Sequence, residues 1–158
     1  MAKQDQNPGR KRRGCYEVNN VTWCRENRTI LAEIQDQKAS AAVGRAGEHL
    51  ALAYLSLAGY ICTLCQIKDH DAYIQTDTQL LTLQVKTASK LHKTTNRYAF
   101  HTPKKNVGVS DVFAFVAIDV GAVLFRRGDE LTSVTTYVSP EEFMDEKLSM
   151  QKTFDSFK

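Results

Sequence analysis

The feature that most constrains the fold is a pair of short alternating segments joined by a polar turn. Residues 71–75 read DAYIQ, residues 80–88 read LLTLQVKTA, and the residues between them are TDTQ. Alternation of polar and apolar residues with a period of two is typical of β-strands that bury one face. Two such runs around a short polar segment predict a β-hairpin.

The register of this hairpin decides which side chains share a face. If the turn is centred between Asp77 and Thr78, Asp71 lies opposite Gln84 and Asp69 lies opposite Lys86. Paired residues share a sheet face, as do residues two apart on one strand, so Asp71, Gln84 and Lys86 project together. A register slip of two residues would put Asp69 in the place of Asp71. Tyr73 and Gln75 would share the polar face, with Ile74, Leu83 and Val85 on the other.

Helical and strand patterns continue on both sides of the hairpin. We expect helices over 27–40, 39–60 and 139–154, and strands over 60–67, 96–102, 111–120 and 122–127. The strand at 60–67 should be buried on both faces, Asp111 should open its strand, and Ser139 should cap the last helix. This order predicts the α/β class, with a mixed central β-sheet of about five strands flanked by helices.

The helix expected at 39–60 carries an apolar stripe with one acid beside it. The stripe consists of Val43, Ala46, Leu50, Ala53 and Leu57. Glu48 borders this stripe without belonging to it. Because the stripe should pack on the sheet, Glu48 would lie within reach of the polar face of the hairpin.

Charge is distributed unevenly along the chain. Residues 86–105 have a net charge of +6 with no acid, residues 1–13 a net charge of +4, and residues 128–158 a net charge of −4. Two basic segments and an acidic end indicate one face for a polyanion such as DNA, with a solvated surface as the plain alternative. The candidate DNA contacts are Lys90, Lys93, Arg97, His101, Lys104, Lys105, Arg10, Lys11, Arg12 and Arg13. His70 and His101 are also candidates for proton transfer.

Other classes of protein fit the sequence less well. No apolar run reaches the roughly 20 residues that a membrane span needs, and residues 1–14 lack the apolar core of a secretory signal. We therefore expect a soluble, cytoplasmic protein of cellular or phage origin. A zinc-dependent interaction protein would need a second close cysteine pair beside Cys62 and Cys65, whereas Cys15 and Cys24 are far apart, so buried thiols are expected.

The polar face of the hairpin has a definite chemical use. Mg²⁺ prefers hard oxygen ligands and keeps several waters. Asp71 offers a carboxylate, Gln84 an amide oxygen and Val85 a backbone carbonyl. Glu48 can hold the metal or one of its waters. Lys86 can orient or deprotonate an attacking water and offset charge on a phosphate, so the set predicts Mg²⁺-assisted phosphodiester hydrolysis.

The order of these segments resembles the PD-(D/E)xK nuclease superfamily, which includes restriction enzymes, Holliday-junction resolvases and some group I intron homing endonucleases. The runs GRAGEHLALAYLSLAGY, DAYI, LQVKTA, YAF and DVFAFVAID are most similar to the small intron-encoded type, across residues 40–127. The resemblance implies a restriction-endonuclease-like core, with the catalytic Glu, Asp and Lys at Glu48, Asp71 and Lys86.

Two positions depart from the pattern of that superfamily. Gln84 stands where the second acid is usually found, which removes a negative charge and implies weaker metal binding, with one metal rather than two. His70 stands where a proline usually precedes the aspartate. The departure at Gln84 also keeps open a DNA-binding module that has retained the fold without cleavage.

The resemblance implies a site-specific double-stranded DNA endonuclease of the homing type that uses Mg²⁺ as a homodimer or homotetramer. A Holliday-junction resolvase, or a restriction or repair nuclease, would use the same chemistry on another DNA shape. Residues 1–39 are expected to form a basic N-terminal extension with a short helix. Residues 40–158 are expected to form one nuclease domain.

Overall fold

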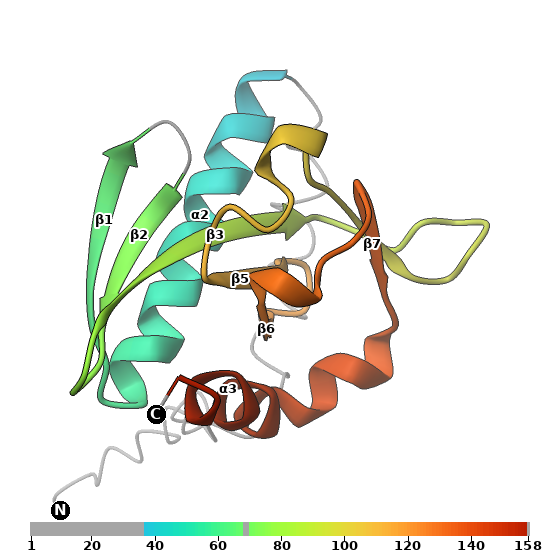
Figure 1. The fold of residues 1–158 in the computed structure, drawn as a ribbon. Coiled ribbons are helices and arrows are strands. Elements are labelled where there is room, and N and C mark those ends of the chain that lie inside the picture. The colour runs from blue at the N-terminus through green and yellow to red at the C-terminus, as the bar shows by residue number, and fades with distance from the viewer. Residues whose placement is uncertain (1–36, 68–69, 158) are drawn as a thin grey trace, which may run out of the picture.

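A mixed sheet forms the centre of the computed structural model, which describes residues 37–67 and 70–157 (Figure 1). Its five strands lie in the order β1-β2-β3-β5-β6. β3 and β5 are parallel, and the other neighbouring pairs in this sheet are antiparallel. The predicted α/β class is confirmed. The strands are β1 (Ile61–Ile67), β2 (His70–Gln75), β3 (Leu80–Ala88), β5 (Val112–Ala117) and β6 (Ala122–Arg127).

Two helices cover one face of this sheet, and a smaller sheet covers part of the other. The helices are α2 (Gln37–Leu57) and α3 (Glu146–Asp155). The smaller sheet pairs β4 (Tyr98–His101) with β7 (Thr135–Val138), and the 3-10 helix η4 (Pro140–Asp145) packs with it. Two further 3-10 helices are η2 (Lys104–Asn106) and η3 (Gly128–Glu130).

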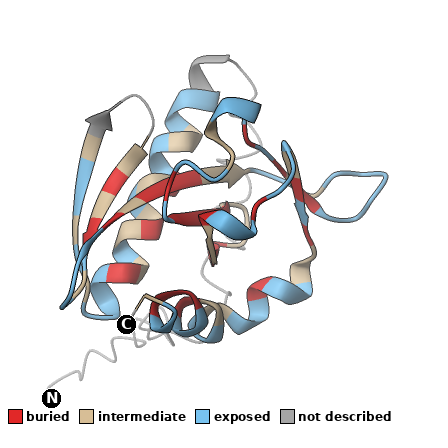
Figure 2. Cartoon of the chain, viewed as in Figure 1, coloured by how far each residue is buried: buried red, intermediate tan, exposed pale blue. Residues whose placement is uncertain are grey.

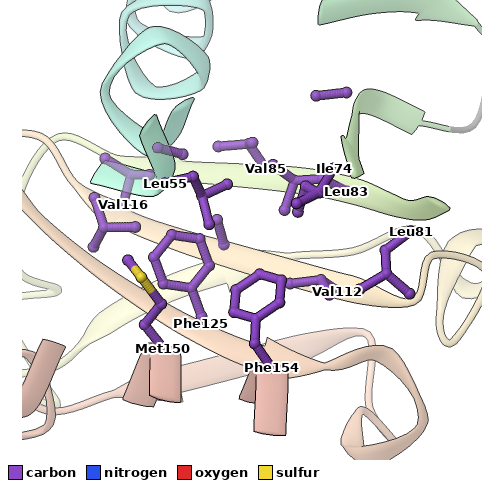
Figure 3. Close-up of a cluster of buried hydrophobic side chains, with 14 residues drawn as sticks. Leu55, Ile74, Leu81, Leu83, Val85, Val112, Val116, Phe125, Met150 and Phe154 are labelled. Carbon is purple, nitrogen blue, oxygen red and sulfur yellow. The ribbon is translucent and has the colours of Figure 1, made fainter. Parts of the chain in front are cut away.

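The larger hydrophobic core lies between the sheet and its two helices (Figure 3). Leu55 of α2, Phe125 of β6 and Phe154 of α3 meet there with buried side chains of the central strands. Complete burial of a leucine or phenylalanine side chain stabilises a fold by about 1.5–3 kcal/mol. A second core on the opposite face joins Phe113 and Phe115 of β5 to β4, β7 and η4. β5 is buried along its whole length because both cores meet on it.

The hairpin has the register that the sequence predicts. Ala72 pairs with Leu83, and Gln75 pairs with Leu80. Ala72 and Leu83 are fully buried in the core beneath α2, and Gln75 is exposed. One residue beyond the last registered pair, Asp71 and Gln84 are joined by a side-chain hydrogen bond.

The strand predicted at 60–67 is present as β1, but the expectation that both its faces are buried was wrong. β1 lies at the edge of the sheet, where Ile61 is 68% exposed and Leu64 is 39% exposed. An apolar run of this length suits a central strand. The consecutive antiparallel order β1-β2-β3 nevertheless leaves the first strand of the series at the edge.

The apolar stripe predicted on α2 was only partly right, since Leu50 packs against the core but Ala46, Ala53 and Leu57 are exposed. The buried positions of the helix are Gly47, Ala51 and Leu55, which lie one turn apart, whereas Leu57 is 79% exposed. The hydrophobic pattern did not predict the burial of Gly47, because a glycine carries no hydrophobic side chain. Its missing side chain is what lets the helix approach the sheet: a Cβ built at Gly47 would lie 1.9 Å from Oγ1 of Thr87.

The C-terminal region contains a strand that the sequence analysis did not identify. β7 has the sequence TTYV, whose β-branched and aromatic residues favour strands. Residues 139–154, expected to form one helix, divide into η4 and α3. The division lets Phe143 pack in the second core while Phe154 packs in the first. Ser139 begins this region as predicted, and its N–H donates to Oε1 of Glu142 at 2.9 Å.

Part of the expected N-terminal structure lies outside the described residues. The helix predicted at 27–40 overlaps the described chain only at its last four residues, which belong to α2. The remainder of the expected N-terminal extension is not described. Among the described residues, the helices are too short or too polar to cross a lipid bilayer.

Glu146, at the start of α3, gives a prediction about stability. Burial raises the pKa of this half-buried carboxyl, although Val123 donates its N–H to it at 3.1 Å. The folded state therefore favours the protonated carboxyl of Glu146 over the ionised one. The stability contributed by this protonated carboxyl is present below the unfolded-state pKa and is lost as the pH rises through the folded-state pKa. Glu146→Gln should therefore raise the melting temperature at pH 8 by about 1–3 °C. The gain should vanish near pH 4, and an equal gain at both pH values would contradict this assignment.

Candidate functional site

The candidate site lies where β2 and β3 cease to pair. The registered pairs between these strands end at Ala72 and Leu83, one residue from Asp71. Beyond that pair, Oδ2 of Asp71 accepts the backbone N–H of Val85 at 2.6 Å and also accepts a hydrogen bond from Nε2 of Gln84. The carboxylate thus spans the two strands, and these bonds hold it at a fixed place.

Gln84 is the most buried polar side chain of this group. Its exposed fraction is 6%, and it pairs across the sheet with Phe113, so one side of it is apolar. A buried amide needs hydrogen-bond partners, because an unpaired one costs about 1–3 kcal/mol. Asp71 supplies such a partner. The predicted pairing of Asp71 with Gln84 is therefore present as a side-chain contact.

Lys86 occupies the next position on the same face of β3. Burial lowers the pKa of its amine, and the nearby negative charge of Asp71 opposes part of that change. The lysine pairs across the sheet with Phe115, whose ring belongs to the second core. Burial beside apolar groups lets this amine give up its proton more readily than a solvated one, and the carboxylate of Asp71 offsets part of that effect.

Glu48 reaches this group from α2. Burial raises the pKa of its carboxyl, and the charge of Asp71 raises it further, whereas His49 and Arg45 lower it. The influence of Asp71 shows that the two carboxylates are electrostatic neighbours. Gly47 packs closely on Thr87, and these two residues adjoin Glu48 and Lys86 in sequence.

Asp71 thus forms a hydrogen bond with Gln84 and lies within electrostatic range of Lys86 and Glu48, the other two side chains predicted to form the site. Among the residues that the structure covers, no group of three or more His, Cys, Asp and Glu side chains is placed to hold a metal ion. A hard cation bound here would rest on two carboxylates, with neutral oxygens completing its ligands. The charge of Asp71 helps to raise the pKa of Glu48, and a cation between the two groups would offset that repulsion.

The predicted DNA contacts that the structure describes are on the surface. Lys90, Lys93, Arg97, His101, Lys104 and Lys105 are all exposed. The first three belong to the segment that joins β3 to β4, and Lys104 and Lys105 form most of η2. Arg10, Lys11, Arg12 and Arg13 lie outside the described residues.

The remaining candidate residues are His70, Asp111, His101 and Asp69. Nδ1 of His70 lies 2.9 Å from Oγ of Ser110, a contact that no local sequence pattern predicts. Asp111 precedes β5, as expected, and its Oδ2 accepts the backbone N–H and the hydroxyl of Thr82 at 2.8 and 2.7 Å. His101 lies in β4, opposite Thr135. Asp69 is outside the described residues.

The cysteines show no sign of a metal centre within the described chain. Cys62 and Cys65 are free and half-buried. Burial raises the pKa of the Cys62 thiol to about 11, which disfavours the thiolate that zinc requires. Cys15 and Cys24 lie outside the described residues.

Comparison with known proteins bears on the fold. The chain matches no family model and no curated protein. Among solved structures, it is similar to a bacterial homing endonuclease, I-Ssp6803I, with a TM-score of 0.59 and 14% sequence identity. The similarity covers 77% of this chain and 96% of that chain. At this level of identity, the likeness shows a shared fold.

Proposed function

We propose that this protein is a Mg²⁺-dependent endonuclease that cuts double-stranded DNA, and that its site is of the PD-(D/E)xK type. The observation that carries the proposal is the hydrogen-bonded and electrostatic group formed by Asp71, Gln84, Lys86 and Glu48 where β2 and β3 separate. The likeness of the fold to a homing endonuclease supports it.

The residues present fit a single divalent cation. Asp71 and Glu48 would supply carboxylate oxygens, and Val85 its backbone carbonyl. Gln84 would supply its amide oxygen after a half-turn of the amide, which exchanges Nε2 for Oε1 beside Asp71. When bound, the cation would polarise the phosphate and its own water.

Lys86 would have two roles, one toward the proton of the attacking water and one toward the negative charge on the phosphate. Its depressed pKa suits a group that accepts a proton from an attacking water. The protonated form of the same amine would stabilise negative charge that develops on the phosphate oxygens. Asp71 would stabilise the protonated form of the amine through its charge.

The exposed basic residues favour DNA as the substrate. Such side chains contact phosphates without regard to sequence and make binding strongly dependent on salt. Of the functions that share this chemistry, we favour homing-type cleavage because the similar structure is a homing endonuclease. A Holliday-junction resolvase or a restriction or repair nuclease would differ only in the preferred DNA shape or site.

One site cuts one strand, so cleavage of a duplex favours two or four copies of the chain. Exposed apolar side chains are available at Leu57, at the end of α2, and at Met144 and Leu148 near the C-terminus. Analytical ultracentrifugation would show the assembly. A monomer that cuts both strands in one binding event would contradict this expectation of two or four copies.

Nicking of supercoiled plasmid tests the function. Wild-type protein with Mg²⁺ should convert the plasmid to open-circular and linear forms, and EDTA should stop the reaction. Asp71→Asn keeps an acceptor for Val85 but removes the charge, and it should lower the rate at least about 100-fold. Asp77→Asn, in the exposed turn before β3, is the matched control and should cut normally. A gel shift without nicking would instead support the cleavage-inactive DNA-binding module.

Gln84→Glu gives a prediction about metal affinity. The substitution restores the acid found in related sites and adds a negative charge beside Asp71, so the metal should bind more tightly. We expect the Mg²⁺ concentration for half-maximal nicking to fall by roughly tenfold, since each 1.4 kcal/mol of binding free energy is one factor of ten. A titration of rate against Mg²⁺ measures it. An unchanged midpoint would mean that residue 84 does not face the metal.

A further inference from the structure

A basic finger projects from the body of the molecule directly after the candidate site. It consists of residues 89–97, which join β3 to β4, and it extends beyond the two sheets (Figure 1). Residues 92–97 are all exposed, as the colouring of Figure 2 shows. Its base is fixed, because Leu91 packs against the second core and Tyr98 is buried in it.

The finger has a defined internal structure. His92 and Arg97 form a β-bridge, in which the N–H of His92 donates to the carbonyl of Arg97 at 2.8 Å. The N–H of Asn96 donates to the carbonyl of His92 at 2.9 Å, and Asn96 has a φ of +51°. Asparagine tolerates this left-handed conformation, so the tip is a closed turn of four residues.

Neutral polar groups occupy the tip, and cations flank them. Thr94 and Asn96 carry a hydroxyl and an amide, while Lys90, Lys93 and Arg97 lie beside them in sequence. The whole segment from 86 to 105 contains no acid that would repel a polyanion. The finger thus combines hydrogen-bonding side chains at its tip with positive charge beside them.

We propose that this finger enters the major groove of duplex DNA, where Thr94 and Asn96 contact base edges and the three cations contact phosphates. The inference rests on the proposed nuclease function and adds the element that reads the sequence. The major groove is about 12 Å wide and admits a two-stranded ribbon, whereas the minor groove is only about 6 Å wide. Asparagine can bond to N6 and N7 of adenine, and the threonine hydroxyl can bond to donors or acceptors of the base edges, while its methyl group can contact a thymine methyl.

The length of the finger limits which base pairs it can read. Thr94 is eight residues from Lys86, and an extended chain spans at most about 3.5 Å per residue. The tip therefore reaches at most about 28 Å from the lysine. At roughly 3.4 Å per base pair, this is about eight base pairs from the scissile phosphate.

Selection from a pool of duplexes with a randomised central segment tests the inference. The full chain carrying Lys86→Ala would be used, so that bound DNA stays intact, and selected duplexes would be sequenced. Thr94→Ala with Asn96→Gly removes the two polar side chains, and glycine keeps the positive φ. Thr78→Ala, in the turn at the other end of β3, is the matched control. Lys93→Gln tests the phosphate contacts.

The two tip substitutions should reduce the preference for one short block of base pairs at least about tenfold. Thr78→Ala should select the same sequences as the parent. Lys93→Gln should keep the selected sequences but lower the slope of log affinity against log salt by about 0.9. The inference is overturned if the tip variant selects the parental sequences, or if the parent binds DNA with no preference while wild type still cuts plasmid. Failure of wild type to bind or cut any DNA would overturn the proposed function as well.

Discussion

Lys86→Ala is expected to lower the rate of plasmid nicking by at least about 1,000-fold, because it removes both a proton acceptor and a cation beside the phosphate. Lys86 belongs to the group centred on Asp71, where burial has already lowered its pKa. The substitution leaves the backbone of β3 and its pairing with β5 intact, so the melting temperature should change little. Rates under single-turnover conditions measure the effect.

Lys147→Ala is the control for this experiment. Lys147 is an exposed lysine on α3, and its removal changes the net charge of the protein by the same amount. Equal loss of activity in both variants would mean that Lys86 acts only through the overall charge. Lys86→Arg separates the two roles of the amine, because arginine keeps the charge but does not give up its proton.

The depressed pKa of Lys86 predicts the form of the pH profile. If the neutral amine accepts a proton, the rate should rise with pH and level off once the lysine is deprotonated, at a pH below the usual range for lysine. A rate that falls through that same pH would show that the protonated amine is the form required. Lys86→Arg should remove whichever limb belongs to the lysine.

Gly47→Ala is expected to destabilise the protein by about 1–3 kcal/mol and to reduce nicking at the same time. A Cβ at this position would lie 1.9 Å from Oγ1 and 2.9 Å from Cγ2 of Thr87. Either the threonine or the helix must move. A shift of α2 would carry Glu48 away from Asp71, so Mg²⁺ dependence should weaken along with stability. Chemical denaturation and a metal titration measure the two effects.

Gly44→Ala, one turn earlier on α2, is the matched control. A Cβ there meets nothing within 4 Å, so alanine should stabilise the helix by up to about 1 kcal/mol. Adding Thr87→Ala to Gly47→Ala should restore most of the lost stability, because it removes the two closest atoms. A loss of stability in Gly47→Ala together with a gain in Gly44→Ala would confirm that close packing, and not helix propensity, determines the effect at Gly47.

Local patterns in the sequence predicted the elements that depend on local physics. The alternation in residues 71–88 and the polar turn within them specified the register of the hairpin, and with it the contact between Asp71 and Gln84. β6 has the bounds that were expected from its apolar run. The side-chain period of a strand is two, so a correct turn fixes every partner beyond it.

Features set by the assembled sheet could not be predicted in this way. The edge position of β1 depends on which strands lie beside it, and its sequence carries no such information. The role of Gly47 depends on a threonine forty residues later. The contact between His70 and Ser110 likewise joins two segments that are brought together only by the fold.

The two faces of β3 have different surroundings, and this determines which substitutions in the strand the fold can tolerate during evolution. Leu83 and Val85 face the helix-covered core, while Gln84 and Lys86 face the opposite way. Under the proposed function, substitutions at Gln84 or Lys86 would therefore remove catalysis while leaving the core-facing residues of the same strand unchanged. In related proteins that bind DNA without cutting it, we expect the inactivating substitutions within β3 to lie at the positions of Gln84 and Lys86.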